Sequence, residues 1–330
     1  MKKLYLLSND QVWLSKKNYT SNNDLDNIIS CLNKNYDLRL ICRKSKKKLN
    51  FPIKNKIKHC NFNKISDQNL KILLISISPY NFFVLIYLIF FKKLSLEGYV
   101  YLRSDGFLEY KYRYGFLGYY FYFLMFFFIK KYLKIISCSK NFTNVNVKKI
   151  IHPSELNRKW FKKSKQKKYI TDFLYVGRFK KDKGAIYLAK NFKNILTDYN
   201  LTILGTEKKY ISKEFYSKNI NYINAISNVN RLIKIYDTSR IFILPSYIEG
   251  FPKVISESLA RLKPIIIFND INYVIHGRKG IFVCKRNERS LRKTINYIFK
   301  NYAKIQKRIK KNYFYTKNNF KTELLKSIEK

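Results

Sequence analysis

Short apolar runs alternate with helical segments along almost the whole chain, and this alternation constrains the fold more than any other feature. Parallel strands are buried on both faces and read as continuous apolar runs, so the alternation predicts an α/β fold built on parallel sheets. In the first half the apolar runs lie at 4–7, 38–42, 72–77, 99–102 and 134–137. In the second half they lie at 172–176, 201–204, 220–223, 240–244, 265–268 and 280–283. The helical segments of the second half lie at 184–195, 229–236, 252–262 and 288–300.

The chain has 330 residues, which suggests two domains because a domain averages roughly 150 residues. The Lys- and Asn-rich segment 157–169 separates the two series of runs and is the predicted linker. We therefore expect an N-terminal domain over 1–156 and a C-terminal domain over 170–300. Residues 301–330 form a basic, periodic helical tail that could cross back to the N-terminal domain.

The net charge is +46, from 67 Lys and Arg against 21 Asp and Glu. Part of this excess is compositional, because Lys, Asn, Ile, Tyr and Phe dominate together, as AT-biased codon usage produces. The rest indicates an anionic partner, either a membrane surface or a nucleic acid. A membrane is favoured, because the aromatic residues cluster in apolar blocks instead of alternating with basic residues. The apolar fraction of 46% excludes a disordered basic protein.

The five Cys lie far apart and the chain has three His, which argues against a disulfide scaffold and against a zinc site. A reducing compartment is the expected location. The apolar start of the chain is interrupted at Asn9 and Asp10, before it reaches the length of a signal peptide. We expect a buried first strand there.

Two uncharged stretches have some features of membrane spans. The first, 72–91, is broken at Pro79 and Asn81, so we expect a strand followed by a separate helix. The second, 114–129, is 16 residues long, rich in Tyr and Phe, and flanked by basic residues. Two interpretations of it stay open: a core helix, or a helix that dips into a bilayer surface. Neither requires a spanning helix.

The first motif with chemical content is YVGRFKKDKG at 175–184. A strand ends at Gly177 and a helix begins near Gly184, with Arg178 and Lys183 in the loop between them. Two cations beside a helix N-terminus suit a diphosphate.

The second motif lies between the strand at 240–244 and the helix at 252–262. Glu249 precedes this helix and Glu257 lies inside it, with seven residues between them. Free amides at the helix start would face an anionic or hydroxyl-rich ligand. Each acid also has an ordinary interpretation: Glu249 as a helix N-terminal acid, and Glu257 as an exposed helix residue.

These motifs together resemble the retaining GT-B glycosyltransferases of family 4, also called group 1 glycosyltransferases. That family carries a Glu-x7-Glu motif in an EGFP-like stretch, here EGFPKVISE, and an Arg and a Lys in a loop like GRFKKDKG. The resemblance extends over 172–300 and includes ILG at 203–205 and GIFV at 280–283. It implies two Rossmann-like parallel-sheet domains that face a central cleft. It also implies a nucleotide-diphosphate-sugar as donor substrate, with no metal and no cofactor.

The resemblance assigns roles to the motif residues. Gly177, Arg178 and Lys183 would bind the donor diphosphate, and the two cations would support the leaving nucleotide. Glu249 would contact hydroxyls of the transferred sugar, and Glu257 would hold the ribose hydroxyls. The peptide groups near the sugar would be those of Gly250, Phe251 and Pro252.

Two weaker assignments follow from the same resemblance. The loop that ends at Ile226 falls where such enzymes cradle the base. The family often has a His at the end of an N-domain strand, where this chain has the segment 101–106. Asp105 or Arg103 could take that place beside the sugar, although Asp105 could equally be a turn residue before Gly106.

The chain departs from the family pattern in three places. Leu262 replaces a usual Gly, so the local turn there could differ. No glycine occurs before Gly98, and Ser8-Asn9-Asp10-Gln11 stands where relatives have a glycine-rich loop. Asp24-Leu25-Asp26 has the letters of a metal-binding DxD motif but follows no strand, so we expect no metal there.

The resemblance and the composition together predict a bacterial, metal-independent glycosyltransferase that retains anomeric configuration. We expect it to be peripheral on the cytoplasmic face of the inner membrane, where it would act on a lipid-linked or cell-envelope glycan. Its expected partners are a nucleotide sugar, a glycan or lipid-linked acceptor and an anionic membrane surface, but no nucleic acid. The alternative is a non-catalytic or nucleic-acid-binding basic protein on a GT-B-like scaffold.

Overall fold

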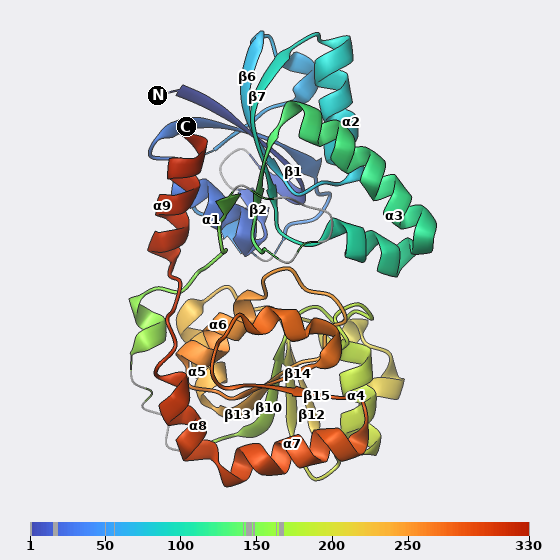
Figure 1. Cartoon of the computed structure of the whole chain (residues 1–330), viewed down its shortest axis with the longest axis vertical. Coiled ribbons are helices and arrows are strands. Elements are labelled where there is room, and N and C mark those ends of the chain that lie inside the picture. Colours follow the sequence, from blue (N-terminus) through green and yellow to red (C-terminus); the bar gives the residue numbers. More distant parts are fainter. Residues whose placement is uncertain are drawn as a thin grey trace. The chain divides into compact units, whose positions relative to one another are not determined.

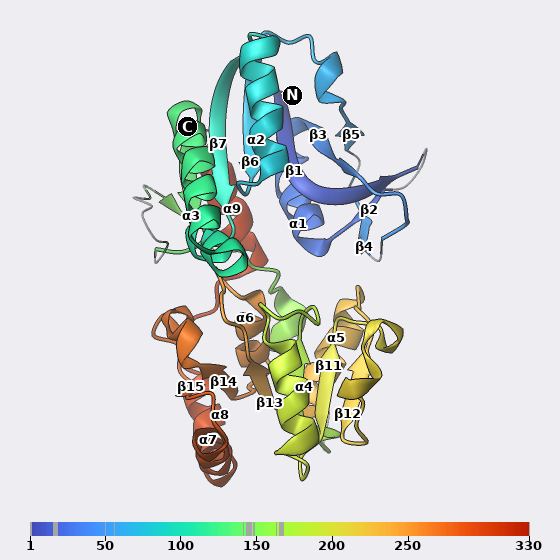
Figure 2. The ribbon, with the colours of Figure 1, turned by 90° about the vertical axis from the view of Figure 1, so that its right-hand side faces the viewer.

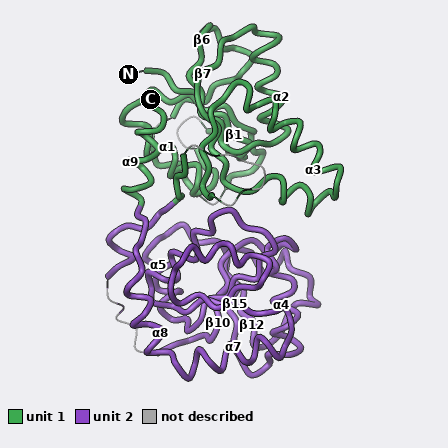
Figure 3. The backbone as a smooth tube through the Cα atoms, viewed as in Figure 1, with its two compact units in different colours: residues 1–153, 317–330 green, residues 154–316 purple. Residues whose placement is uncertain are grey.

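Parallel sheets form the centre of both halves of the computed structural model, which divides into two units (Figure 3). Unit 1 comprises Met1–Pro153 and Lys317–Lys330, and unit 2 comprises Ser154–Thr316. The predicted linker at 157–169 falls in unit 2, and its residues 163 and 165–167 lie outside the described residues. The structure describes residues 2–15, 19–49, 51–55, 57–140, 142, 147, 149–162, 164 and 168–329.

The sheet of unit 1 is built around its first strand, β1 (Lys2–Leu14). Leu6 of β1 pairs in parallel with Leu40 on one side and with Leu73 on the other, and it is fully buried. The parallel strands run in the order β5-β3-β1-β6-β7-β8-β9, and the far end of β1 continues into an antiparallel extension through β2 and β4. The bounds are β2 (Tyr19–Ser21), β3 (Tyr36–Lys44), β4 (Phe51–Ile53), β5 (Lys58–His59), β6 (Asn69–Ile75), β7 (Ser95–Leu102), β8 (Lys134–Ser137) and β9 (Lys149–Ile150).

Helices cover both faces of this sheet, with α1 and α9 on one side and α2 and α3 on the other (Figure 1). Ser78 caps α2 and Pro79 occupies its first turn, which confirms the predicted break between strand and helix in 72–91. From the far end of the chain, α9 packs against α1 and places Phe320 beside Tyr101. The bounds are α1 (Asn23–Leu32), α2 (Pro79–Ile86, continued by a π-helical turn Tyr87–Phe91), α3 (Gly106–Tyr132) and α9 (Lys317–Ile328).

The sheet of unit 2 is parallel throughout, with the strand order β12-β11-β10-β13-β14-β15. Helix α4 lies on one side of it, and α5 and α6 lie on the other (Figures 1 and 2). The strands are β10 (Thr171–Val176), β11 (Leu201–Leu204), β12 (Ile220–Ile223), β13 (Ser239–Leu244), β14 (Ile265–Phe268) and β15 (Ile281–Cys284). The helices are α4 (Ala185–Asn194), α5 (Val229–Asp237), α6 (Lys253–Ala260), α7 (Glu288–Lys300) and α8 (Tyr302–Ile309).

Both sheets are doubly wound, and each has a point where the strand order reverses. In unit 2 the order reverses between β10 and β13, and in unit 1 between β1 and β6. Ligands of open α/β sheets bind outside the carboxyl ends of the strands at such a reversal. Both predicted motifs of unit 2 follow the two strands at its reversal, so the topology brings them to one place.

The structure confirms the predicted α/β class with two parallel-sheet units. None of the helices within the described ranges combines the length and the apolar composition that a membrane span requires. Leu262 adopts a left-handed φ of 58° where α6 ends, and the next amide, of Lys263, donates back to Ser258 O at 3.0 Å. Helices commonly end with a residue in this left-handed conformation, which is usually glycine. The turn after α6 therefore has the conformation expected with glycine, although Leu262 occupies the position.

Candidate functional site

Glycines let the motif loops of unit 2 approach neighbouring backbone at the carboxyl edge of the sheet. A Cβ atom on Gly184 would lie 1.9 Å from the carbonyl oxygen of Pro245, and Gly184 has a left-handed φ of 65°. A Cβ atom on Gly205 would lie 2.6 Å from the carbonyl oxygen of Gly177. The loops after β10, β11 and β13 can therefore lie this close only because these positions carry no side chain.

Lys183 and Glu249 come from the two motif loops and form an ion pair. Lys183 Nζ lies 2.9 Å from Glu249 Oε1, and Ser246 donates its hydroxyl to the same oxygen at 2.6 Å. The backbone joins the loops as well, because the amide of Tyr247 donates to Asp182 O at 3.0 Å. The structure thus brings together two predicted site residues that are 66 positions apart in the chain.

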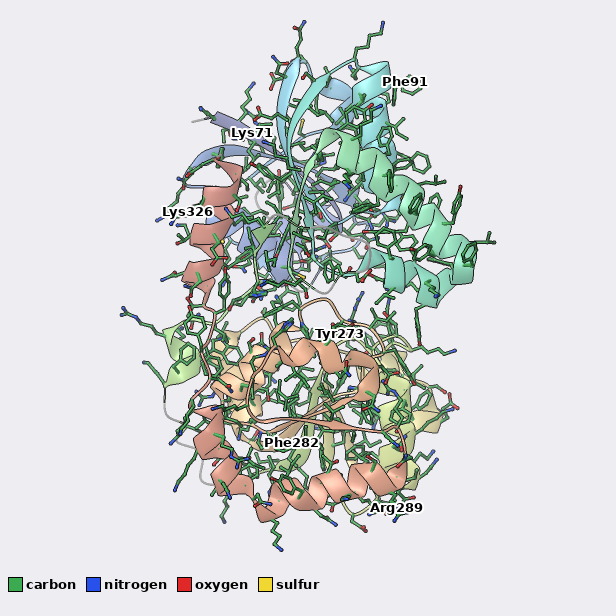
Figure 4. All side chains as sticks on the ribbon, viewed as in Figure 1. Lys71, Phe91, Tyr273, Phe282, Arg289 and Lys326 are labelled. Atoms are coloured by element: carbon green, nitrogen blue, oxygen red, sulfur yellow. The ribbon has the colours of Figure 1, made fainter. Side chains whose placement is uncertain are left out.

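The backbone of Glu249 is held by Tyr273, a residue that the motifs did not indicate. The Tyr273 hydroxyl donates to Glu249 O at 2.8 Å and accepts from the Glu249 amide at 3.0 Å. Tyr273 lies in the 3-10 helical segment Asn269–Ile275, which follows β14, and is labelled in Figure 4. The sequence gives no sign that Tyr273 belongs to the site, because it lies 24 residues after Glu249 and is one of 28 tyrosines.

Arg178 is exposed, and its guanidinium has no side-chain partner within the described part of the chain. Its position is set through the backbone, because the buried Tyr175 donates its hydroxyl to Arg178 O at 2.9 Å. Burial and the nearby Glu249 raise the pKa of Tyr175, so this phenol stays protonated and keeps donating. Arg178 is therefore a cation that a ligand could engage without displacing another group.

Glu257 is buried, so its interpretation as an exposed helix residue is wrong. Tyr236 of α5 donates its hydroxyl to Glu257 Oε2 at 2.8 Å. Burial and the Glu257 charge raise the pKa of Tyr236 well above its ordinary value, which keeps the phenol a donor. The carboxylate of Glu257 is thus held in one orientation inside α6. The burial could not be read from the sequence, because a Glu inside a helix is usually exposed.

Three residues lead into α6 after Glu249. Gly250 and Pro252 are buried, and Pro252 precedes the first helical residue. Pro252 has no N–H, so Gly250, Phe251 and the first turn of α6 supply the amides here. The ring of Phe251 lies 5.4 Å from the guanidinium of Arg278. Arg278 is itself partly buried, and this burial lowers its pKa to about 10.

Ile226 lies beyond β12, the edge strand of the unit 2 sheet, and is half-buried against its core. Its loop leaves the sheet at the same carboxyl edge as the two motif loops. The structure therefore places Ile226 at the same carboxyl edge of the sheet as Lys183 and Glu249, and its strand, β12, lies two strands away from β10.

Arg286 is a further residue that the motifs did not indicate. It donates from Nη2 to Pro245 O at 2.8 Å and to Ser246 O at 2.9 Å, and its Nε lies 2.7 Å from Asp270 Oδ2. Its guanidinium also lies over the Tyr247 ring at 3.9 Å. Arg286 therefore fixes the turn that carries Ser246, which in turn binds Glu249.

In unit 1 a polar cluster lies where the strand order reverses. Arg103, after β7, donates to Ser76 Oγ at 3.1 Å and pairs with Asp10 at 3.3 Å and more distantly with Asp24 at 3.9 Å. Burial lowers the pKa of Arg103, but the two carboxylates outweigh it and the net shift is upward. Ser8 donates to Asp10 at 2.8 Å. The segment that replaces a glycine-rich loop thus supplies an ion pair to this cluster.

Asp105 and Asp26 have structural partners. Asp105 is buried and caps α3, accepting from the Leu108 amide at 3.1 Å, which corresponds to its interpretation as a turn residue before Gly106. Asp26, from the DxD letters, is also buried and accepts from the Lys54 amide at 2.9 Å. Among the described residues no three His, Cys, Asp or Glu side chains gather as metal ligands would.

Comparison with protein families finds one match to unit 2. Residues 157–314 match the model of the family "Glycosyl transferases group 1". A capsular polysaccharide biosynthesis glycosyltransferase, CapM of Staphylococcus aureus, is 32% identical over 147 residues, which is 37% of this chain and 38% of that one. An uncharacterized glycosyltransferase of Haemophilus influenzae is 27% identical over 180 residues, 48% of this chain and 50% of that one. The matched segments thus span half or less of these relatives.

Solved structures extend the likeness to both units. Sucrose-phosphate synthase of Thermosynechococcus elongatus has a TM-score of 0.70 at 12% identity, and the match covers 99% of this chain and 98% of that one. HepE of Anabaena, in complex with UDP and glucose, has a TM-score of 0.68 at 12% identity, and the match covers 100% of both chains. At such identities the likeness establishes the fold, which is that of GT-B glycosyltransferases.

Proposed function

We propose that this protein is a retaining group 1 glycosyltransferase of family 4, which moves a sugar from a nucleotide-diphosphate-sugar to a lipid-linked or cell-envelope glycan. The observation that carries the proposal is the meeting of Lys183 with Glu249 at the strand reversal of unit 2, at 2.9 Å. The family match over 157–314 supports it. So do HepE, solved with UDP and glucose, and CapM, named for capsular polysaccharide biosynthesis.

The donor diphosphate would bind beside the loop after β10. Arg178 is exposed and offers its guanidinium, and Lys183 is held close by its pair with Glu249. Two cations at this place favour the negative charge that develops on a departing nucleotide, and such electrostatic stabilisation is often the largest contribution to catalysis. These cations would take the role that a metal ion has in other transferases, so we propose metal-independent transfer.

Glu257 would hold the ribose of the nucleotide. Its carboxylate is buried and already oriented by Tyr236, which donates to Oε2 at 2.8 Å. A carboxylate can accept from two vicinal hydroxyls, and prior orientation reduces the entropy lost on binding. Ile226 lies at the same edge of the sheet and would contribute to the base pocket.

Glu249 would bind hydroxyls of the transferred sugar. Lys183 and Ser246 both engage its Oε1, and Tyr273 fixes its backbone, so the carboxylate has a defined position. The amides of Gly250 and Phe251 would lie beside the sugar. The protein would then orient donor and acceptor and stabilise the leaving group, and transfer would retain the anomeric configuration without a carboxylate nucleophile.

The acceptor and the cellular location belong to the same proposal. We place the protein at the cytoplasmic face of a bacterial membrane, since a net charge of +46 attracts an anionic surface. Asp105 is less suited to a place beside the sugar, because it is buried and caps α3. Of these two residues, Arg103, with its two carboxylate partners, is the better candidate.

Nucleotide binding tests the proposal directly. Thermal unfolding would be followed with UDP, GDP, ADP and their sugar conjugates, with and without a chelator. A ligand at about 100 times its Kd adds about 2.7 kcal/mol of stability, which is readily seen. We expect a shift with one nucleotide class that survives chelation and is lost in Glu257→Gln and in Arg178→Gln. The control is Lys190→Gln, which removes one exposed charge from α4.

Two results would count against the proposal. A shift that Glu257→Gln and Arg178→Gln leave unchanged would place the nucleotide elsewhere. No shift with any nucleotide, together with tight binding to single-stranded nucleic acid, would favour the alternative of a non-catalytic basic protein. Product analysis by NMR then decides whether the anomeric configuration is retained.

A further inference from the structure

The outer side of α3 is apolar where a surface helix is normally polar. After a kink at Gly115 (φ 67°), the helix buries Tyr122, Met125 and Ile129 against unit 1. The opposite side is also apolar, and Leu117 is 80% exposed there. A helix that is apolar all round is normally enclosed on all sides. The exposed apolar residues of this outer side are Phe116, Leu117, Tyr120, Phe121, Leu124 and Phe127.

Helix α2 and its π-helical turn extend the same surface. Phe90 and Phe82 contact Phe128 of α3, with ring centroids 6.1 and 5.3 Å away, so the two helices pack side by side. Phe91 is 75% exposed and points away from the end of α2 (Figure 4), and Phe83 is exposed as well. Soluble monomers rarely expose apolar patches of this extent unless something binds them.

Basic residues border this aromatic face, which we define as the exposed residues of α3 after Gly115 together with Phe83, Phe90 and Phe91. Lys93 follows the end of α2, and Lys130 and Lys131 lie in the last turn of α3, all exposed. Lys111 is exposed before the kink, whereas Arg113 is paired with Glu109 at 2.6 Å. Positive charge therefore lies at both ends of the apolar surface.

We propose that the aromatic face inserts into the interfacial region of an anionic lipid bilayer, with α3 lying along the surface. Aromatic side chains with basic neighbours suit the headgroup boundary, where the rings enter the acyl region and the ammonium groups meet lipid phosphates. A second copy of the chain is a poorer occupant, because the face is basic at both ends and a two-fold contact along α3 would bring lysines of the two copies together. The inference gives the proposed membrane location its contact surface and does not depend on the donor site.

Vesicle binding tests this face without any nucleotide. The full chain would be mixed with sedimentable vesicles of phosphatidylglycerol and phosphatidylcholine, or of phosphatidylcholine alone. The test variant is Phe91→Ser with Phe116→Ser and Leu117→Ser. Its matched control carries three substitutions of equally exposed apolar residues on unit 2, namely Ile170→Ser, Tyr210→Ser and Tyr313→Ser.

We expect the chain to bind anionic vesicles and the test variant to bind at least about 100-fold more weakly, with the control unchanged. Each of Lys130→Gln and Lys131→Gln should weaken binding by up to about fivefold at low salt. Equal loss in test variant and control, or unchanged binding in the test variant, would overturn the proposal. Dimerisation of the chain that the test variant abolishes, without vesicle binding, would assign the face to a second copy instead.

Failure here and failure of the proposed function are distinguishable. Nucleotide-dependent thermal shifts report on unit 2, and the test variant lies entirely in unit 1. A test variant with normal shifts but no vesicle binding supports the inference and shows that unit 2 is still folded. Its far-ultraviolet circular dichroism should match that of the unsubstituted chain, because all three replaced side chains are largely exposed.

Discussion

Substitution of Gly184 by Ala should separate the two motif loops of unit 2. The new Cβ would lie 1.9 Å from Pro245 O, well inside the contact distance, and backbone on one side or the other must move. The left-handed φ of 65° adds about 1 kcal/mol of strain. Overpacking of this kind costs about 1 to 3 kcal/mol more, so the expected loss in unfolding free energy is about 3 kcal/mol.

Gly277 provides the matched control for this substitution. It has almost the same φ, 69°, but a Cβ atom there would meet nothing within 4 Å. Gly277→Ala should therefore show only the strain of the left-handed backbone, about 1 kcal/mol. The difference between the two variants isolates the close approach of Gly184 to Pro245.

The same pair of variants should differ in nucleotide binding. A shift of either loop would lengthen the contact between Lys183 and Glu249, now 2.9 Å, so Lys183 would lose its present position and nucleotide binding should weaken in Gly184→Ala but not in Gly277→Ala. Chemical denaturation and calorimetric titration with the nucleotide that shifts the melting temperature give both quantities. If Gly184→Ala proves no worse than Gly277→Ala in either measurement, the two loops are not held together by this contact.

Three further predictions concern side-chain contacts in unit 2. Arg286→Lys loses the planar guanidinium that joins the two turn carbonyls to Asp270, so it should weaken nucleotide binding about tenfold in titration, whereas Arg289→Lys at an exposed position of α7 should not. Tyr236→Phe removes the phenol that donates to Glu257 Oε2 and should cost about 1 to 3 kcal/mol in denaturant unfolding; an unchanged midpoint would contradict the buried contact. Burial lowers the pKa of Lys263 from its ordinary value of 10.5 to about 8. Between these two pH values the unfolded chain binds more protons than the folded chain, so the free energy of unfolding should rise with pH. Lys263→Met should lack this rise, which is about 2 kcal/mol between about pH 7 and pH 10. If the free energy of unfolding of the variant and of the unsubstituted chain depends on pH in the same way, the lowered pKa of Lys263 is refuted.

Much of the fold could be predicted from the sequence because its strands are buried on both faces. The run at 72–77 is apolar at nearly every position, and Pro79 marks the start of the next helix, so strand and helix could be separated by eye. The helix predicted at 114–129 corresponds to the part of α3 after Gly115, whose φ of 67° and ψ of −152° are not helical, and a further helical segment capped by Asp105 precedes it from Gly106. Capping and kinks depend on local hydrogen bonds that the apolar pattern does not report.

The residues of the candidate site likewise fall into those that could be predicted from the sequence and those that could not. Lys183 and Glu249 could be predicted because they lie in loops that follow strands, where parallel sheets place their ligands. Arg286 and Tyr273 could not, since one basic residue among 67 and one tyrosine among 28 carry no signal until the fold sets them beside the motif. The buried state of Glu257 likewise depends on Tyr236, which comes from a different helix.

Helix α9 has a consequence for how the chain folds as it is made. It belongs to unit 1 but is synthesised after all of unit 2, and it buries Phe320, Leu324 and Ile328. Translation of unit 2 takes about 10 to 30 s at ordinary rates, during which the surface of α1 and Tyr101 that α9 covers stays open. Unit 1, although it emerges first, can therefore complete its fold only after unit 2 has been synthesised.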